Sequence, residues 1–353
     1  MINISRRGYF GILTISVALP AVLLFTATRK QETTAHLFTN QNENRLQTRT
    51  QPSPEHTPHQ KTKHSARKTP QSPVQWLASV SQSQGNIHEK LALLQSGLPR
   101  QDITALWQDM IQEKTSLHSG QLPGSEKWES EMIFNALLDA LVEAGTKAQA
   151  AGETTEIITT LFCQLIATRQ NDGVLRDYAI QRGLMLAADS LPADSSDREN
   201  IIHTTLEELT AANLDQFHTG TALNTLLSFK AQWSPAEHTV IQDHIQDLIS
   251  TLPENLMADT PATPGSPDLQ VRIPLLTAIG GWHIQSALPH LEQAIHSGQP
   301  SLQIPAIAAW SQFPQDLRQQ NPLHRQIETW ATSQSPLRYA AEAALSRTTA
   351  SAP

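Results

Sequence analysis

A pattern of ten residues occurs three times in the last third of the chain, and it restricts the possible folds more than any other feature. The three copies are VRIPLLTAIG at 271–280, LQIPAIAAWS at 302–311 and LRYAAEAALS at 337–346. The second copy starts 31 residues after the first, and the third starts 35 residues after the second. Similar segments at such a spacing are typical of repeat proteins, in which each unit buries its apolar faces against the next unit.

Alanine and large apolar residues recur at fixed places in the three copies. The eighth position is Ala278, Ala309 or Ala344, and the tenth is a glycine or a serine. The first and ninth positions are large and apolar. Small side chains allow neighbouring helices to approach closely, and large ones fill the space between layers. We therefore expect the three copies to be helices that lie side by side in successive layers.

The second and fourth positions of the pattern also suggest specific roles. The second position is Arg272, Gln303 or Arg338. We expect the arginines to reach a carboxylate or a carbonyl oxygen of the next layer, which is a structural role. Pro274 and Pro305 hold the fourth position in the first two copies. We expect them in the first turn of their helices, where a missing N–H group costs nothing.

This pattern resembles the second helix of a HEAT-like repeat, whose common form is Val-Arg-x-x-Ala-x-x-Ala-Leu-Gly. ALPHLEQAIHSG, from Ala287, and LHRQIETWATSQ, from Leu323, fit the first helices of two units. LRDYAIQRGL, from Leu175, fits a degraded fourth copy. The resemblance covers residues 268–347, and it implies an α-solenoid, a stack of antiparallel helical hairpins.

The chain between its first 73 residues and these copies also predicts helices, because apolar residues recur every three or four positions. Residues of high β-propensity form no long alternating run, which argues against a β-rich fold. Ser195 and Ser234 stand where helix N-caps are expected. One helix is expected to place Trp128, Met132, Leu137, Leu138 and Leu141 on one apolar stripe and to end at Gly145. The sequence therefore predicts an all-α fold.

The first 30 residues have the pattern of a membrane-targeting segment. Arg6 and Arg7 precede 21 uncharged residues, from Gly8 to Thr28. A helix of about 20 apolar residues spans the hydrocarbon core of a bilayer. A cut after Ala27 would place the bulky Phe25 where a signal peptidase prefers a small residue. We therefore favour a retained signal anchor, with a cleaved signal peptide as the alternative.

The location of the protein follows from this segment. SRRGYF, at residues 5–10, resembles a twin-arginine export signal, although Gly11 stands where that signal often has a lysine. Basic residues also follow the apolar stretch, at Arg29 and Lys30, so the charge bias does not fix the orientation. We expect a single-pass protein of the cell membrane with its body on the outer, periplasmic side. The opposite orientation and export after cleavage stay open.

A polar segment follows, which predicts a flexible tether. Residues 31–73 are rich in Gln, Thr, Pro, His and Lys and have almost no periodic apolar residue. Such a segment cannot bury enough apolar area to offset its ordering entropy. His56, His59 and His64 lie close together there without a carboxylate or cysteine pattern, which favours linker residues over a metal site. Ser65–Lys68 matches the bare Ser-x-x-Lys pattern, but a flexible segment does not hold a nucleophile in place.

These observations divide the chain into four expected parts. They are a signal anchor or signal peptide at 1–30, a disordered basic linker at 31–73, an irregular helical array at 74–265, and HEAT-like repeats at 266–353.

The distribution of charge limits the possible partners. The net charge is −8, but residues 74–353 hold fifteen Lys or Arg against thirty Asp or Glu. An acidic body disfavours nucleic acid as a partner, because phosphate binding needs basic surfaces. The remaining expected contacts are a protein partner for the body and the membrane for the N-terminal helix.

No motif in the chain predicts catalysis, a cofactor or a metal. The single cysteine, Cys163, lies in an apolar run and is expected to be buried. The sequence lacks a phosphate-binding loop, a dinucleotide-binding fingerprint, H-E-x-x-H and G-x-S-x-G. His238 and His244 are expected to be solvated. Three tryptophans of the repeat region are expected in the core rather than in a groove, namely Trp282, Trp310 and Trp330.

The leading functional hypothesis is a membrane-tethered scaffold without catalysis of its own, which binds a protein partner at the cell envelope. Helical arrays offer long surfaces for such binding. The alternative is an envelope enzyme, or an accessory domain of one, whose site is not visible as a motif. A structural spacer is the third possibility.

Overall fold

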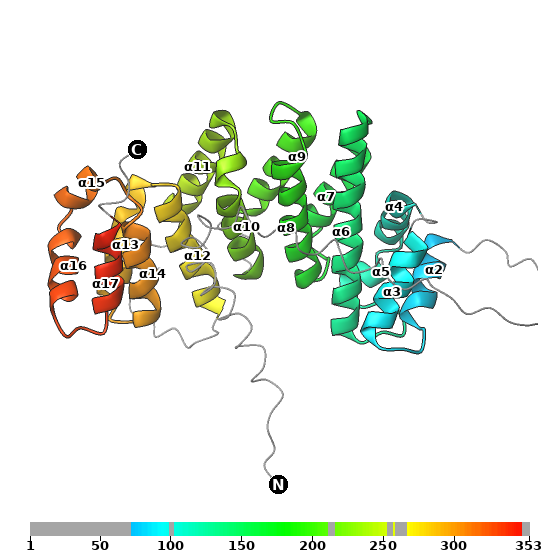
Figure 1. Cartoon of the computed structure of the whole chain (residues 1–353), viewed down its shortest axis with the longest axis horizontal. Helices are drawn as coiled ribbons and strands as arrows, with labels where there is room; N and C mark the ends of the chain where they lie inside the picture. The colour runs from blue at the N-terminus through cyan, green and yellow to red at the C-terminus, as the bar shows by residue number, and fades with distance from the viewer. Residues whose placement is uncertain (1–71, 99–101, 211–215, 253–256, 258–266, 348–353) are drawn as a thin grey trace, which may run out of the picture. The chain divides into compact units, whose positions relative to one another are not determined.

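The structure is a computed structural model, and all regular structure in its described residues is helical (Figure 1). The predicted all-α class is therefore confirmed. None of the described helices is both long and apolar enough to cross a membrane. The predicted anchor at 1–30 and nearly all of the predicted linker lie outside the described residues, which are 72–98, 102–210, 216–252, 257 and 267–347.

The described helices belong to one compact unit, Thr69–Pro353. In chain order they are α2 (Pro73–Ser81), α3 (Ile87–Gly97), α4 (Ile103–Glu113), α5 (Thr115–Ser119), α6 (Lys127–Ala151), α7 (Glu156–Ala167), α8 (Gly173–Asp189), α9 (Ser196–Glu208), α10 (Gln216–Ser228), η4 (Lys230–Gln232), α11 (Pro235–Ser250), α12 (Pro267–Gly281), η5 (Gln285–Ala287), α13 (Leu288–His296), α14 (Pro300–Trp310), α15 (Gln315–Gln320), α16 (Leu323–Thr332) and α17 (Arg338–Ser346).

From α6 onwards, most of the helices pack in two rows. In the first row, each helix contacts the next one; its members are α6, α8, α10, α12, α14 and α17. The second row contains α7 and α9, which contact each other, and also α13 and α16. Each second-row helix packs against a first-row helix that neighbours it in the chain, so consecutive helices form hairpins (Figure 1).

The N-terminal helices pack at one end of these rows. α2 contacts α3 and α4, and α4 contacts both α6 and α7. A buried ion pair ties α3 to α6, with 2.8 Å between Lys90 Nζ and Glu129 Oε2. The N-terminal helices therefore belong to the same packed unit as the rest.

The three copies of the ten-residue pattern lie in α12, α14 and α17, which pack side by side as predicted. Ala278, Ala309 and Ala344 are all buried. Gly280 lies so close to α14 that an added Cβ would be 2.5 Å from the carbonyl oxygen of Ala309. The small residues of the pattern therefore allow the backbones of α12 and α14 to touch, which confirms the predicted role of these positions.

The predicted position of the two prolines is wrong. Pro274 is the eighth residue of α12 and Pro305 is the sixth residue of α14, so both lie beyond the first turn. Each proline removes one hydrogen bond of its helix. At Pro274 the missing hydrogen bond leaves the carbonyl of Gln270 without its partner within the helix. This carbonyl lies close to α10: a Cβ added to Gly220 would be 2.8 Å from the oxygen of Gln270. The prediction failed because α12 starts at Pro267 and α14 at Pro300, before the copies of the pattern at 271 and 302.

The predicted role of the second position holds only in part. The prediction concerned the arginines; the glutamine at this position, Gln303, donates from Nε2 to the carbonyl oxygen of Ile295 in its own hairpin, at 2.7 Å. Arg338 pairs with Glu342 one turn further along the same helix, at 2.7 Å between Nε and Oε1, so the predicted contact to another layer is wrong there. Since Arg338 lies in the last helix described, no further layer faces it within that part of the chain.

Arg176, the second residue of the degraded copy, does make the predicted contacts. Its Nε donates to the carbonyl oxygen of Ile166 at the end of α7, at 3.1 Å. Its Nη2 lies 2.9 Å from Glu208 Oε2 at the end of α9. This buried arginine therefore joins two hairpins through a carbonyl and a carboxylate.

The structure confirms the predicted N-caps and corrects the expectation for α6. Ser195 and Ser234 both accept a hydrogen bond from a first-turn N–H group.

Gly145 does not end α6, because it is buried within that helix. Trp128 and Met132 are 46% and 41% exposed, so they do not belong to the core. Leu137, Leu138 and Leu141 of the predicted stripe are buried, together with Ile133 and Phe134, so the stripe is correct for its three leucines and wrong for Trp128 and Met132.

Candidate functional site

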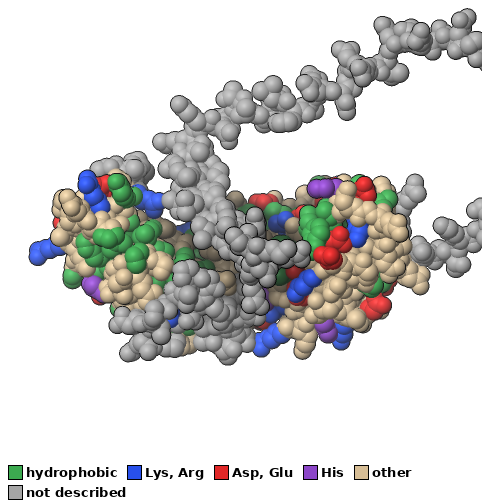
Figure 2. All heavy atoms as spheres, turned by 90° about the horizontal axis from the view of Figure 1, so that it is seen from below, with side chains coloured by type: hydrophobic (Ala, Val, Ile, Leu, Met, Phe, Trp, Pro, Cys, Tyr) green, Lys and Arg blue, Asp and Glu red, His purple; other side chains and the backbone are tan. Residues whose placement is uncertain are grey.

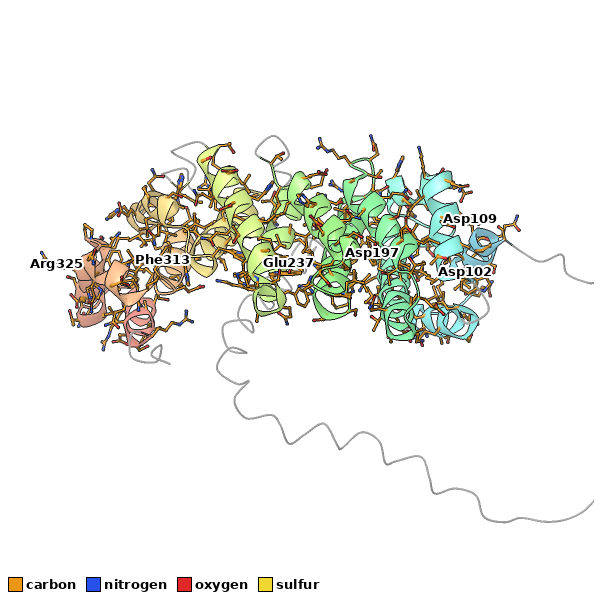
Figure 3. The ribbon with its side chains drawn as sticks, turned by 90° about the horizontal axis from the view of Figure 1, so that it is seen from above. Asp102, Asp109, Asp197, Glu237, Phe313 and Arg325 are labelled. Atoms are coloured by element: carbon orange, nitrogen blue, oxygen red, sulfur yellow. The ribbon has the colours of Figure 1, made fainter. Side chains whose placement is uncertain are left out.

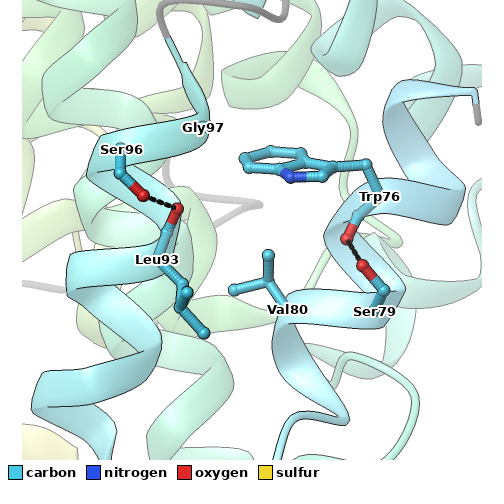
Figure 4. Close-up of a pocket in the computed structure, with 6 residues that line it drawn as sticks. All are labelled: Trp76, Ser79, Val80, Leu93, Ser96 and Gly97. Carbon is cyan, nitrogen blue, oxygen red and sulfur yellow. Dashed lines mark hydrogen bonds between the residues drawn. The ribbon is translucent and has the colours of Figure 1, made fainter. Parts of the chain in front are cut away.

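A pocket of about 360 Å³ lies between α2 and α3 (Figure 4). Its apolar wall is formed by Trp76, Val80 and Leu93. The two hydroxyl groups in its lining donate to carbonyls of their own helices, Ser79 to Trp76 at 2.7 Å and Ser96 to Leu93 at 3.0 Å. No titratable side chain lines this pocket, so its lining supplies no acid or base for catalysis.

The exposed side of the first row carries large apolar residues at one repeated position. The third position of the ten-residue pattern is Ile273, Ile304 or Tyr339. Ile273 is half-buried, Ile304 is 45% exposed and Tyr339 is 81% exposed. Equivalent positions of stacked repeats point in the same direction, so these side chains mark one continuing face of the row. Figure 2 shows hydrophobic side chains gathered at the end that α13 to α17 form.

A second exposed apolar group lies on α6, also in the first row. Trp128 and Met132 are four residues apart, so they lie on the same side of the helix. The indole Nε1 of Trp128 donates to Glu126 Oε2 at 2.7 Å, which satisfies its polar edge and leaves the ring exposed. Figure 2 shows hydrophobic, acidic and basic side chains side by side in the region of α6.

Two ion pairs join α6 to α8 on either side of this group. Lys127 Nζ lies 2.8 Å from Asp172 Oδ2 at the start of α8. Arg182 pairs with Asp139 further along both helices. The twelve steps from position 127 to position 139 span about 18 Å of helix. The two pairs therefore fix the register of α6 against α8 over roughly three turns.

Glu131 and Tyr178 lie between those ion pairs, and both are half-buried. Burial raises the pKa of Glu131, Lys127 lowers it, and Asp172 raises it further, with a net increase. Burial also raises the pKa of the Tyr178 hydroxyl, and the charge of Glu131 adds to that shift. The two side chains thus interact across the contact of α6 with α8. In this part of the site negative charge exceeds positive charge.

The most extensive buried polar contact centres on Arg198 in α9. Its guanidinium forms a two-point ion pair with Glu237 at the start of α11, with 2.7 Å from Nε to Oε1 and 2.9 Å from Nη2 to Oε2 (Figure 3 labels Glu237). It also donates to the carbonyl oxygens of Ala187, Leu191 and Gln232. Because these groups close the end of α8 and the turn before α11, Arg198 has a structural role.

The ion pair with Arg198 gives stability a defined pH dependence. Burial alone would raise the pKa of Glu237, but hydrogen bonds from Arg198 and Ser234 outweigh burial and lower it. A carboxyl group whose pKa is lower in the folded state stabilises the fold at neutral pH, and loses that effect as pH falls through the folded pKa. The Glu237→Gln variant should therefore be less stable than wild type at pH 7. This difference should shrink as pH falls below about 4.3, the pKa of an unfolded glutamate, and close once pH is below the lower pKa of the folded state.

Urea unfolding at a series of pH values measures this difference. Glu143→Gln is the matched control, because Glu143 is 65% exposed and pairs only with Lys147 on its own helix. Its stability should stay close to wild type throughout the series. A Glu237→Gln deficit that is constant from pH 7 to pH 3 would contradict the assignment.

The predicted core role of the repeat-region tryptophans is confirmed. Trp282 and Trp310 are 2% and 0% exposed, and Trp330 packs half-buried against the core.

The prediction that His238 and His244 are solvated is wrong. Both are half-buried, and their Nε2 atoms lie 2.8 Å and 3.1 Å from the carbonyl oxygens of Lys230 and Leu209. The two histidines lie on different sides of α11, and each bonds to a carbonyl of a neighbouring segment. The spacing of two residues within one helix does not predict such contacts.

Cys163 is half-buried in α7 rather than fully buried. Burial raises the pKa of its thiol, which disfavours the reactive thiolate at neutral pH.

Among the residues that the structure describes, no group of three His, Cys, Asp or Glu side chains has the arrangement of a metal site. The histidines of the predicted linker and the Ser-x-x-Lys segment lie outside those residues.

Sequence reasoning missed the residues that form the exposed first-row face. The signal was present at the third position of the aligned copies. Ile304 and Tyr339 are large there, whereas the eighth position of the pattern is always alanine. Glu131 and Tyr178 had no such signal, because their proximity depends on the packing of α6 against α8.

Comparison with known proteins adds no further assignment: no family model, no curated protein and no solved structure matches this chain.

Proposed function

We propose that the chain is a membrane-tethered HEAT-like α-solenoid that binds a protein partner on the exposed face of its first row of helices. It serves as a scaffold at the cell envelope and has no catalytic role of its own. The two rows of paired helices and the ten-residue pattern support the repeat architecture. A row of helices that repeats its exposed residues offers an extended binding surface.

The observation that carries this proposal is the repeated exposure of Ile304 and Tyr339. Tyrosine and large aliphatic side chains on a surface are typical of protein interfaces, where they fill pockets of the partner. The two residues hold the same position of the pattern in α14 and α17, which contact each other. The face is thus extended along the row rather than confined to one helix.

The tether is the second part of the proposal, and it is supported by sequence alone. The 21 uncharged residues from Gly8 to Thr28 favour a retained anchor, and the basic segment up to residue 73 favours a flexible linker. We place the body on the periplasmic side of the membrane. Export after cleavage is the alternative, and both place the scaffold outside the cytoplasm.

Site-specific cross-linking in cells tests the proposed face. A photoreactive phenylalanine analogue at position 304 or 339 should yield a discrete adduct, and mass spectrometry should identify the same partner from both positions. The analogue at Val240 in α11 is the control, because that side chain is 44% exposed but does not belong to the first row. We expect no adduct with that partner from position 240.

Two results would count against the proposed face. The first is an adduct of equal yield from position 240, and the second is the lack of any adduct from both first-row positions. Position 339 is the more sensitive probe, since Tyr339 is the more exposed of the two side chains.

A further inference from the structure

We infer that the α6–α8 patch, formed by Trp128, Glu131, Met132 and Tyr178, recognises a basic amphipathic segment of the protein partner. This inference rests on the proposed function, because it names the chemistry of the partner for an exposed patch on two further helices of the first row. The patch combines an exposed apolar surface with a carboxylate that lacks a counter-charge in an ion pair, and each part restricts the ligand.

The apolar part of the patch requires an apolar side chain from the ligand. Trp128 and Met132 are 46% and 41% exposed and share one side of α6. The only hydrogen-bond donor of the Trp128 ring is already satisfied by Glu126. Methionine adapts its shape to different partners, and tryptophan contributes a large rigid surface. A leucine or phenylalanine of an amphipathic segment fits this surface.

The acidic part requires a cation. Among the described residues, Glu131 forms no ion pair within 4 Å, whereas Asp172, Asp139 and Asp177 each have a partner. Lys127 pairs with Asp172, Arg182 pairs with Asp139, and Asp177 Oδ1 lies 2.9 Å from the imidazole of His218. Removing a half-buried carboxylate from water is unfavourable, and the charge of Lys127 offsets this effect only in part, so a cation from the ligand would stabilise Glu131 further.

The surroundings of Glu131 favour a lysine or an arginine over a free metal ion. Glu131 is the one carboxylate among the four residues that define the patch, and a divalent cation prefers several oxygen ligands. The charge of Glu131 raises the pKa of the Tyr178 hydroxyl, so the aromatic ring lies near the carboxylate, and such a pair suits a guanidinium or an ammonium group. The acidic character of residues 74–353 would also attract a basic segment at longer range.

Peptide binding to the full chain in detergent micelles tests the inference. The probe is a fluorescent 14-residue peptide of leucine and lysine at helical spacing, and the matched peptide has glutamate in place of each lysine. We expect the basic peptide to bind more tightly. Glu131→Gln should weaken its binding about tenfold, because it removes one charged contact and keeps the shape of the side chain.

A second variant and a control separate this patch from general acidity. Trp128→Ala should also weaken the basic peptide about tenfold, through the loss of apolar contact. Glu143→Gln should change binding less than twofold, because Glu143 lies on the same helix but is already paired with Lys147 at 2.6 Å. The unfolding midpoint of each variant in urea shows whether it is folded.

Three outcomes would overturn the inference. They are equal binding of the acidic peptide, unchanged binding to folded Glu131→Gln, and an equal loss in Glu143→Gln, which would show that any surface carboxylate suffices. Cross-linking from positions 304 and 339 does not depend on this patch. A partner adduct there combined with unchanged peptide binding would leave the proposed function in place and remove only the inference about α6 and α8.

Discussion

The Arg198→Ala variant should lose about 3–5 kcal/mol of unfolding free energy, because removal of one partner leaves the rest of a buried polar contact unsatisfied. Arg198 is 3% exposed. Its removal leaves Glu237 without its counter-charge. The carbonyl oxygens of Ala187, Leu191 and Gln232 also lose their donor. A stability deficit of this size is a large fraction of the stability of an ordinary domain.

Urea unfolding monitored by circular dichroism measures this effect. Arg182→Ala is the matched control, because Arg182 also forms an ion pair between two helices, but its partner Asp139 is 52% exposed. We expect a loss of at most about 1 kcal/mol for that control. Equal losses in the two variants would show that Arg198 acts as an ordinary surface charge.

The Gly280→Ala variant should lose about 1–3 kcal/mol, since one methyl group would have to enter the contact between two helix backbones. An added Cβ would lie 2.5 Å from the carbonyl oxygen of Ala309 and 2.6 Å from its Cα. Backbone atoms of α14 cannot move aside as a flexible side chain can, so α12 and α14 would have to separate. This result runs against helix propensity, by which alanine is better than glycine by about 1 kcal/mol.

Gly173→Ala in α8 is the control for this prediction, because the atoms nearest to its added Cβ are 3.8 Å and 3.9 Å away. We expect that variant to be as stable as wild type or slightly more stable. If thermal unfolding shows Gly280→Ala to be at least as stable as wild type, then α12 and α14 do not touch at this position.

The parts of the fold that could be predicted from the sequence depend on local signals. Ser195 and Ser234 identify helix starts because a capping side chain acts within three residues of its position. The alanines of the ten-residue pattern predicted close packing because the same constraint recurs in each layer. The all-α class follows from apolar spacing that holds along the body.

The failed predictions concern choices that distant contacts decide. Trp128 and Met132 fit an apolar stripe with three leucines, yet only the leucines are buried, and α6 packs through Ile133 and Phe134 as well. Gly145 resembles a helix stop, but it allows Leu186 to approach α6, where an added Cβ would lie 2.9 Å from that side chain. The prolines of α12 and α14 lie inside helices whose starts precede the repeated pattern.

The candidate site was harder to predict than the fold. Its apolar residues were visible in the sequence but could not be told from core residues, because exposure depends on which side of each helix is covered. The role of Glu131 depends on α8, which supplies Tyr178 and Asp172 from more than 40 positions along the chain. No pattern within a single helix contains that information.

The arrangement of contacts in the first row has a consequence for the evolution of such a chain. Each of α8, α10, α12 and α14 makes its main row contacts with the two helices on either side of it. After duplication or loss of one hairpin, only the helices that become new neighbours must pack against each other. The contacts between the other helices of the row keep their geometry. A lineage can in this way lengthen or shorten the proposed binding surface by whole increments, without redesigning the protein.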